Sequence, residues 1–196
     1  ATISSFGANG AIIHYCPSEK TNKVISKDGI YLLDSGGHYL NGTTDVTRTM
    51  CFGEPSAEQK KNFTLVLKGH IALSRVKFPV GIAGVNLDVL ARQALWSYGL
   101  DYAHGTGHGV GHFLSVHEGP QSIAKAKSNG VALREGMVLS NEPGYYAEDE
   151  YGIRIENLLL VKQAVEPGFL EFENLTLVPV DTRMVDASLL DAQEKQ

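Results

Sequence analysis

The chain contains little cysteine: its 196 residues include only Cys16 and Cys51, which do not form a Cys-x-x-Cys pair. This scarcity excludes a small scaffold held together by disulfides, which is typical of secreted domains. Unpaired cysteine behaves as a small apolar residue and is usually buried. We therefore expect two free, mostly buried thiols in a protein of a reducing compartment, the cytoplasm.

Long apolar runs and excess positive charge are also missing. No apolar run approaches the roughly 20 residues that a membrane-spanning helix needs, and no basic segment followed by an apolar one marks secretion. Lys and Arg number 17 against 22 Asp and Glu, which gives a net charge of -5. A nucleic-acid-binding protein needs a basic surface that neutralises phosphates. We therefore expect a soluble protein that binds neither membranes nor nucleic acids.

What the chain does contain is a pattern of strands and helices that suits a single domain. Apolar residues at helical spacing predict a helix that is capped at Glu54 or Ser56 and ends near Val76, and a second helix over 87–98. Four glycines within residues 105–111 predict a tight loop. Strands are expected at 11–14, 30–33, 43–52, 137–141, 152–161 and 175–180. A loop is expected over 145–151. This order predicts an α+β fold, with helices packed on a curved antiparallel sheet.

Two aspartates lie on neighbouring strands of this prediction. Asp34 ends the strand over 30–33, and Asp45 lies inside the strand over 43–52, with Gly-Gly and Asn-Gly turns between them. Residues opposed in an antiparallel hairpin have Cβ atoms about 4.5–5.5 Å apart, where two carboxylates repel unless a cation lies between them. One carboxylate can bridge two metal ions roughly 3.5–4 Å apart. The hairpin thus favours a dinuclear metal site, and turn-capping aspartates are the structural alternative.

Two glutamates also lie in apolar surroundings. Glu142 follows the strand over 137–141, and Glu156 follows Ile153-Arg154-Ile155, where alternation places Arg154 and Glu156 on one face. Buried carboxylates have to be paired or coordinate a cation. A buried salt bridge between Arg154 and Glu156 is therefore the alternative to metal binding. Several carboxylates with a single imidazole suit Mn, Co or Fe better than a structural zinc site.

The histidines divide into candidates for the site and structural residues. Three of them are four residues apart: His104, His108 and His112. The glycines between them argue against a helical His-x-x-x-His zinc site, and spacing leaves open which one is a ligand and which contacts substrate. His14, at a strand end, and His117, on a turn, are further candidates. His38 and His70 receive only structural interpretations.

Six stretches of the chain together resemble the metallopeptidases of the pita-bread fold, and most closely the Xaa-Pro aminopeptidases. The likeness runs from about residue 3 to residue 180. The stretches are Asp34-Ser-Gly-Gly, Gly42-Thr-Thr-Asp-Val-Thr-Arg-Thr, His104-Gly-Thr-Gly-His-Gly-Val-Gly, Val116-His-Glu-Gly-Pro, Asn141-Glu-Pro-Gly-Tyr-Tyr and Gly152-Ile-Arg-Ile-Glu-Asn.

The resemblance implies a pita-bread catalytic domain over residues 1–180 and a peripheral tail, helical or frayed, over 181–196. It implies two divalent metal ions, Mn first and Co, Zn or Fe as alternatives. Asp45 and Glu156 are expected to bridge the ions, Asp34 to complete one coordination shell, and His108 with Glu142 to complete the other.

The same resemblance implies an activity and roles for three further histidines. The expected reaction is removal of the N-terminal residue from peptides with proline second, by a hydroxide held between the metal ions. His14, His104 and His117 are expected to bind substrate. Glu142, His104 and His117 are expected to be catalytic, with Glu142 carrying the proton to the proline nitrogen.

Two alternatives stay open at this point. A prolidase, which takes only Xaa-Pro dipeptides, has similar ligands, although the residues around His117 favour the aminopeptidase. A non-catalytic pita-bread binding module is the alternative from another class, and such modules usually lack the five ligands. Compared with the family the chain is expected to begin partway through the fold, and a homodimer is a further implication.

Overall fold

The computed structural model describes residues 2–113, 115–125 and 130–196. Its strands form two antiparallel sheets and two short ribbons. The first sheet has the order β1-β2-β3, with β1 (Ile3–Phe6), β2 (Gly29–Tyr39) and β3 (Gly42–Phe52). The second has the order β4-β11-β10-β7, with β4 (Lys77–Pro79), β11 (Phe169–Asn174), β10 (Asn157–Gln163) and β7 (Val138–Asn141). The ribbons pair β5 (Gly107–His108) with β6 (Ser122–Ile123), and β8 (Gly144–Ala147) with β9 (Tyr151–Arg154).

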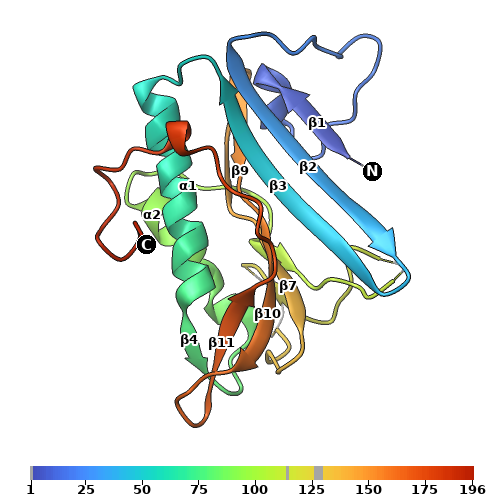
Figure 1. Cartoon of the computed structure of the whole chain (residues 1–196), viewed down its shortest axis with the longest axis vertical. Helices are drawn as coiled ribbons and strands as arrows, with labels where there is room; N and C mark the ends of the chain where they lie inside the picture. The colour runs from blue at the N-terminus through green and yellow to red at the C-terminus, as the bar shows by residue number, and fades with distance from the viewer. Residues whose placement is uncertain (1, 114, 126–129) are drawn as a thin grey trace.

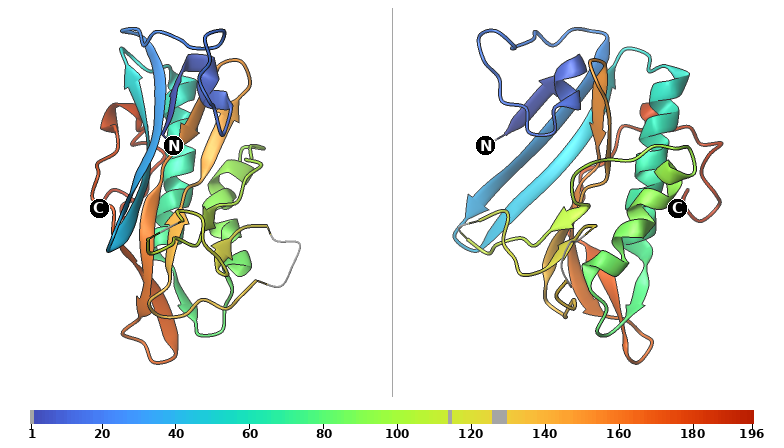
Figure 2. Two further views of the ribbon diagram at one scale, coloured as in Figure 1. Left: turned by 90° about the vertical axis from the view of Figure 1, so that its right-hand side faces the viewer. Right: turned by 180° about the vertical axis from the view of Figure 1, so that it is seen from behind.

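The helices lie beside these sheets. They are α1 (Ala57–Arg75), α2 (Asp88–Trp96) and the 3-10 helices η1 (Gly7–Ala11), η2 (Gly84–Asn86) and η3 (Thr182–Met184). β2 and β3 form a long hairpin that crosses the molecule next to α1 (Figure 1), and α2 lies behind α1 (Figure 2). The α+β prediction is therefore confirmed. Within the described residues, no helix has the length and apolar character needed to cross a membrane.

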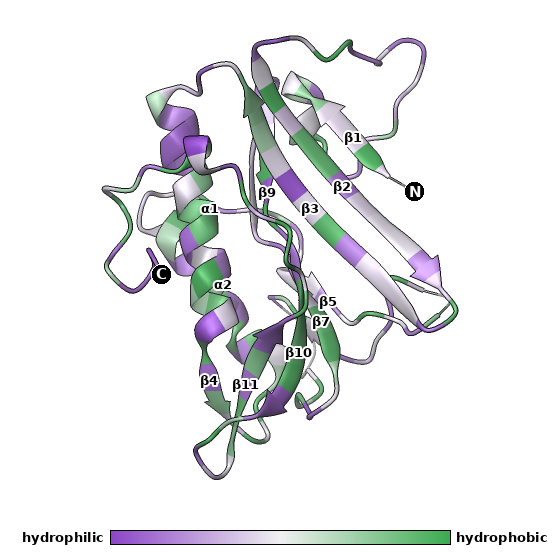
Figure 3. Ribbon diagram, viewed as in Figure 1, coloured by the Kyte–Doolittle hydropathy of each residue, from purple (hydrophilic) through white to green (hydrophobic). Residues whose placement is uncertain are grey.

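The hairpin of β2 and β3 follows from alternation and a tight turn. Polar and apolar residues succeed one another along both strands (Figure 3), and Tyr39 pairs with Gly42, so that only two residues form the turn. Gly36 and Gly37 lie within β2 instead of forming a turn, because Gly36 allows the strands to approach closely. A Cβ added to Gly36 would lie 2.1 Å from the carbonyl oxygen of Thr44.

Helix α1 connects two hydrophobic cores. It begins with a capping box: Ser56 Oγ accepts from the Gln59 amide (3.2 Å), and Gln59 Oε1 accepts from the Ser56 amide (2.8 Å). The helix predicted from this cap is confirmed. One core packs α1 against the first sheet and β9, and contains Phe63, Val66, Leu95, Ile153 and Met184. The other packs its C-terminal end against the second sheet, and contains Leu73, Phe78, Leu139, Leu159 and Phe172.

We expect Gly69→Ala to destabilise the protein, although Gly→Ala within an exposed helix usually stabilises by about 0.5–1 kcal/mol. Gly69 lies where α1 meets α2, and an added Cβ would lie 2.0 Å from the carbonyl oxygen of Ala91. Forcing the helices apart should cost about 1–3 kcal/mol of unfolding free energy. Urea denaturation measures this, with Gly42→Ala, which has open space around its Cβ, as the control. A gain in stability for Gly69→Ala would contradict the expectation.

Several sequence predictions are wrong, each for a local reason. Residues 11–14 form no strand, since η1 ends at Ala11 and Asn9 bonds to the Thr21 carbonyl (2.9 Å). The loop predicted over 145–151 belongs to the β8–β9 hairpin. The single strand predicted over 152–161 is divided, because Ile155 and Glu156 lie between β9 and β10.

At the C-terminal end, β11 was missed and a strand was predicted one segment too late. In β11 the buried residues Leu170 and Phe172 alternate with Glu171 and Glu173, which is the pattern of a strand with one solvent-exposed face. Residues 175–180 form no strand in the structure. Beyond them, η3 is the short helical piece of the expected tail.

Both cysteines are free thiols in the structure. Cys51 is buried in the first core as expected, with 2% of its surface exposed. Cys16 is exposed, so the prediction of a buried thiol is wrong for this residue. It follows His14 and Tyr15 on the irregular segment after η1, where no sheet covers it.

Candidate active site

The break between β9 and β10 places Glu156 in the middle of the fold. Its amide donates to the Thr47 carbonyl of β3 (3.1 Å), and Thr47 Oγ1 donates to its carboxylate (2.6 Å). Glu156 is 1% exposed, between Ile155, which packs in the core, and the start of β10. The junction of the two sheets therefore holds a deeply buried carboxylate.

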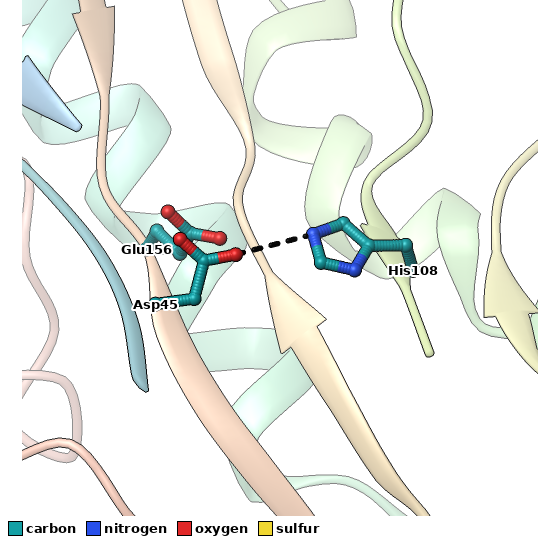
Figure 4. A group of neighbouring side chains, drawn as sticks. All are labelled: Asp45, His108 and Glu156. Carbon is teal, nitrogen blue, oxygen red and sulfur yellow. Dashed lines mark ion pairs between the residues drawn. The ribbon is translucent and has the colours of Figure 1, made fainter. Parts of the chain in front are cut away.

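Asp45 and His108 face this carboxylate. One ligand atom from each of Asp45, His108 and Glu156 lies within 4.8 Å of the others, and Figure 4 shows the three side chains converging from β3, β5 and the β9–β10 junction. His108 Nε2 lies 3.4 Å from Asp45 Oδ2 and 3.3 Å from Glu142 Oε1. Nδ1 of His108 lies 2.9 Å from the Gly109 carbonyl, to which its N–H donates, so Nε2 is the ring nitrogen available to a metal.

Asp34 reaches the same place from β2, and it is Asp34, not Glu156, that pairs with Arg154. Arg154 pairs with Asp34 (Nη2 to Oδ2, 2.8 Å), and Glu156 forms no salt bridge among the described residues. The alternative of an Arg154–Glu156 pair is therefore wrong. Direct opposition of the aspartates is wrong as well: Asp34 pairs with Thr47 and Asp45 with Gly36, so the two carboxylates are diagonal neighbours on one face.

The electrostatics of the cluster favour a bound cation. Burial raises the pKa of Glu156 well above its usual range, and the nearby Glu142 and Asp45 raise it further. Burial also raises the pKa of Glu142. For His108, burial opposes protonation, but the hydrogen bond to Asp45 and the charge of Glu142 outweigh it and raise the pKa. Four clustered carboxylates and one imidazole are the hard donor set of Mn²⁺ and similar ions, so the residues fit the expected metals.

All eight candidate residues line one cavity of about 570 Å³. The five candidate ligands are joined there by His14, His104 and His117, whereas His112 does not take part in the lining. The His117 ring meets the His108 ring edge-on, with centroids 4.3 Å apart. Neither His14 nor His117 has a side-chain hydrogen bond to the described residues, so their ring nitrogens are open to a ligand.

His104 differs from the other two because both of its nitrogens are engaged. Nδ1–H donates to the Gly105 carbonyl (2.7 Å), and Nε2 accepts from the Tyr146 hydroxyl (2.8 Å). Burial lowers the pKa of His104 to about 4, so the ring is neutral at physiological pH. Burial raises the pKa of Tyr146 to about 12, which keeps its proton in place.

Tyr146 is the residue that sequence reasoning missed, and Arg154 was considered only as a partner of Glu156. Arg154 Nη1 donates to the Tyr146 hydroxyl (2.9 Å), which links Asp34, Arg154, Tyr146 and His104 in one hydrogen-bonded row. Burial opposes the charge of Arg154, but Tyr146 and Asp34 outweigh it and raise the pKa. The available signal was the adjacent pair Tyr145-Tyr146 after Pro143-Gly144, because consecutive residues of a strand face opposite sides of it.

A buried histidine behind the site has a consequence for pH dependence. His70 of α1 accepts at its carbonyl from the Asn141 side chain (3.0 Å), while its own Nε2 is buried without a partner in the described part of the chain. Burial, assisted by the charge of Arg48, lowers the pKa of His70 from 6.5 to about 3. The unfolded chain thus binds more protons between these pH values, so stability is lost as pH falls from 6.5 towards 3.

We therefore expect His70→Gln to flatten the acid side of the stability profile. One such residue contributes a slope of up to about 1.4 kcal/mol per pH unit, and the variant should lose that slope whatever its absolute stability. Urea denaturation at a series of pH values from 7 to 4 measures it, with exposed His38→Gln as the control. Identical slopes for His70→Gln and the parent would refute the assignment.

The curved arrangement of sheets, the helices beside it and the carboxylate-lined cavity are those of the pita-bread fold of the metallopeptidases. The chain belongs to metallopeptidase family M24. The model of that family matches residues 1–163, and the model of the C-terminal region of peptidase M24 matches residues 168–196.

Similar proteins carry consistent names. A probable Xaa-Pro aminopeptidase P of Laccaria bicolor is 54% identical over 100% of this chain and 32% of its own length. Aminopeptidase P2 of Arabidopsis thaliana is 54% identical over 98% of the chain and 28% of its own length. The chain thus spans about a third of the length of these curated relatives.

Solved structures agree with this. The X-prolyl aminopeptidase of Caenorhabditis elegans, described as a cytosolic enzyme with a di-nuclear active site, superposes with a TM-score of 0.94 at 52% identity, covering 98% of this chain and 32% of that one. The prolidase of Pyrococcus furiosus gives a TM-score of 0.78 at 29% identity, covering 91% of this chain and 49% of that one. Prolidases are thus the more distant relatives.

Proposed function

We propose that the chain is the metal-binding catalytic part of an Xaa-Pro aminopeptidase, which removes the N-terminal residue from peptides with proline second. The observation that supports this most is the convergence of eight candidate residues on one cavity, with Asp45, His108 and Glu156 within 4.8 Å. The names of the most similar proteins support the same activity. A cytoplasmic location and a homodimer are part of this proposal.

Two divalent ions, Mn²⁺ by the hard donor set, would be held by Asp34, Asp45, His108, Glu142 and Glu156. When bound, such ions supply Lewis-acid polarisation of a carbonyl and an acidified water. Arg154 fixes one oxygen of Asp34 (2.8 Å). Thr47 fixes one oxygen of Glu156 (2.6 Å). Each carboxylate therefore presents its other oxygen in a defined direction.

The remaining residues are assigned to substrate and proton. Glu142, with its raised pKa, can take up a proton and deliver it to the proline nitrogen, and Ser140 Oγ orients its Oε1 (2.9 Å). His14 and His117 have open nitrogens with which to bind the peptide. His104 is neutral and oriented by Gly105 and Tyr146, so it offers the peptide an uncharged imidazole ring in a fixed orientation.

Metal analysis and peptide cleavage on the same preparation test this proposal. Two divalent ions per chain are expected, together with Mn-dependent release of the first residue from an Xaa-Pro-Xaa tripeptide that stops with chelator. Cleavage of Xaa-Pro dipeptides alone would assign a prolidase. A chain that binds no metal and cleaves neither peptide would be a non-catalytic module, and the proposal would fail.

A further inference from the structure

Outside the cavity, helix α2 carries a buried ion pair that the proposed function does not use. Asp88 and Arg92 are 3% and 1% exposed and lie one turn apart. Arg92 Nε donates to Asp88 Oδ2 (2.7 Å) and Nη2 donates to Oδ1 (3.2 Å), which makes the pair bidentate. Neither side chain lines the cavity.

The pair holds the segment 102–106 at three points. Arg92 donates to the carbonyls of Tyr102 (2.7 Å) and His104 (2.8 Å). Asp88 Oδ1 accepts from Thr106 Oγ1 (2.5 Å). The guanidinium also lies over the Tyr102 ring, 3.8 Å from its centroid. One ion pair on a helix therefore binds both ends and the middle of a five-residue stretch.

This segment in turn supports two of the candidate catalytic residues. It carries His104, and the Thr106 carbonyl accepts from the Glu142 amide (2.8 Å). The segment itself has no regular secondary structure and contains Gly105, so its own backbone does little to fix its shape. One hydrogen bond, between the Tyr102 hydroxyl and Thr106 Oγ1 (2.5 Å), joins its two ends, and these same ends are held from outside by Arg92 and Asp88.

Stability alone is a weak explanation for the pair. Replacing a buried ion pair by apolar residues of similar volume is often neutral or favourable, so such pairs add little net stability. Helix α2 already packs through Ala91 and Leu95, both 0% exposed. What an apolar pair could not do is donate to two carbonyls and accept from a hydroxyl at fixed positions, which is how outer residues orient a site.

We propose that Asp88 and Arg92 are positioning residues that hold segment 102–106, and through it His104 and Glu142, in the geometry for reaction. The inference rests on the proposed function for its chemical consequence, whereas the mechanical link can be measured without activity. Loosening the segment should lower kcat more than it changes KM, because the fixed geometry matters most at the transition state.

The first test measures amide hydrogen exchange at Glu142. We expect Arg92→Lys and Thr106→Val to speed exchange of this amide by at least about tenfold, which corresponds to about 1.4 kcal/mol of local opening. Thr106→Val leaves the ion pair itself intact, and so covers the case in which Arg92→Lys does not fold. Leu170→Ala on β11 lowers global stability without touching the segment, and serves as the control for overall unfolding.

The second test measures kinetics in two backgrounds. With metal content unchanged, Arg92→Lys and Thr106→Val should each lower kcat about 10–100-fold. KM should change by less than about threefold in either direction. In a His104→Ala background the same changes should cost at least about threefold less than in the parent, because the link to His104 is already lost and only the link to Glu142 remains. A merely structural role would give the full loss in both backgrounds.

The outcomes separate the two proposals. If the parent chain cleaves no peptide but the variants exchange the Glu142 amide faster, the proposed function fails and the positioning link stands. If the parent turns over peptide normally, and both variants have the same exchange rate and kcat as Leu170→Ala, only the positioning link is overturned.

Discussion

Glu156→Gln should abolish binding of two metal ions and lower peptidase activity by more than about a thousandfold, because losing a ligand forfeits several kcal/mol of charge stabilisation. The amide keeps the shape of the side chain and can still accept from Thr47 (2.6 Å in the parent). The loss would therefore report the missing charge instead of a disrupted junction. Metal content by elemental analysis and turnover of an Xaa-Pro-Xaa peptide measure it.

The same substitution should stabilise the metal-free protein. Burial and the charges of Glu142 and Asp45 raise the pKa of Glu156, so the folded state holds a proton that the unfolded state releases at lower pH. Parent stability therefore falls as pH rises above the ordinary glutamate range, and the variant escapes this loss. We expect a gain of about 1–3 kcal/mol at pH 8 in chelator, measured by urea denaturation.

Glu150→Gln, on an exposed turn, is the control and should change neither metal content nor stability measurably. Retention of both ions by Glu156→Gln would contradict the ligand assignment. If Glu156→Gln has the same stability as the parent in chelator, the raised pKa of Glu156 in the metal-free protein is contradicted.

Arg48→Met should destabilise the protein more than either Gly69→Ala or His70→Gln. The guanidinium is 7% exposed and has no carboxylate partner among the described residues. Burial lowers its pKa, against the attraction of Glu156. Its donors instead satisfy the oxygens of a single cluster: the carbonyls of Thr47, Glu156, Val178 and Pro179 and the side chain of Asn157.

Removing this donor set leaves the buried Glu156 carbonyl without the Arg48 donor and releases residues 178–179 from β3. The expected cost is about 3–5 kcal/mol of unfolding free energy, as for other broken buried polar networks. The midpoint and slope of urea denaturation measure the loss, with exposed Arg183→Met as a control that should stay within about 1 kcal/mol. Equal losses of unfolding free energy for the two substitutions would show that the hydrogen bonds of Arg48 do not stabilise the fold.

The parts of the fold that the sequence predicted are those decided by short-range chemistry. Ser56 and Gln59 cap α1 through their own neighbours. The two-residue turn of Leu40 and Asn41, followed by Gly42, and the alternation in β3 specify a hairpin without distant help. β9 and β10 could not be separated in the same way, because the stretch from residue 153 to 161 contains no Gly or Pro that would mark a break between two strands. It divides only because Glu156 bonds to Thr47, 109 positions away.

The candidate site shows the same division between local and distant information. The residue types alone indicate a cation site, since Asp34, Asp45, Glu142 and Glu156 lie in apolar runs where lone carboxylates are costly. The alternative in which Arg154 pairs with Glu156 was wrong, because strand alternation records the face of a residue and not its distance to another sheet. Tyr146 was missed for that reason too.

The sequence by itself thus determined helix α1, the β2–β3 hairpin, the class of fold and the candidate groups for metal binding, because capping, alternation and burial cost act between near neighbours. Only the tertiary structure decided that Arg154 binds Asp34, that His104 meets Tyr146 and that α2 holds segment 102–106. Those contacts join residues far apart in the chain, and their energies depend on distances of a few ångströms that no local pattern encodes.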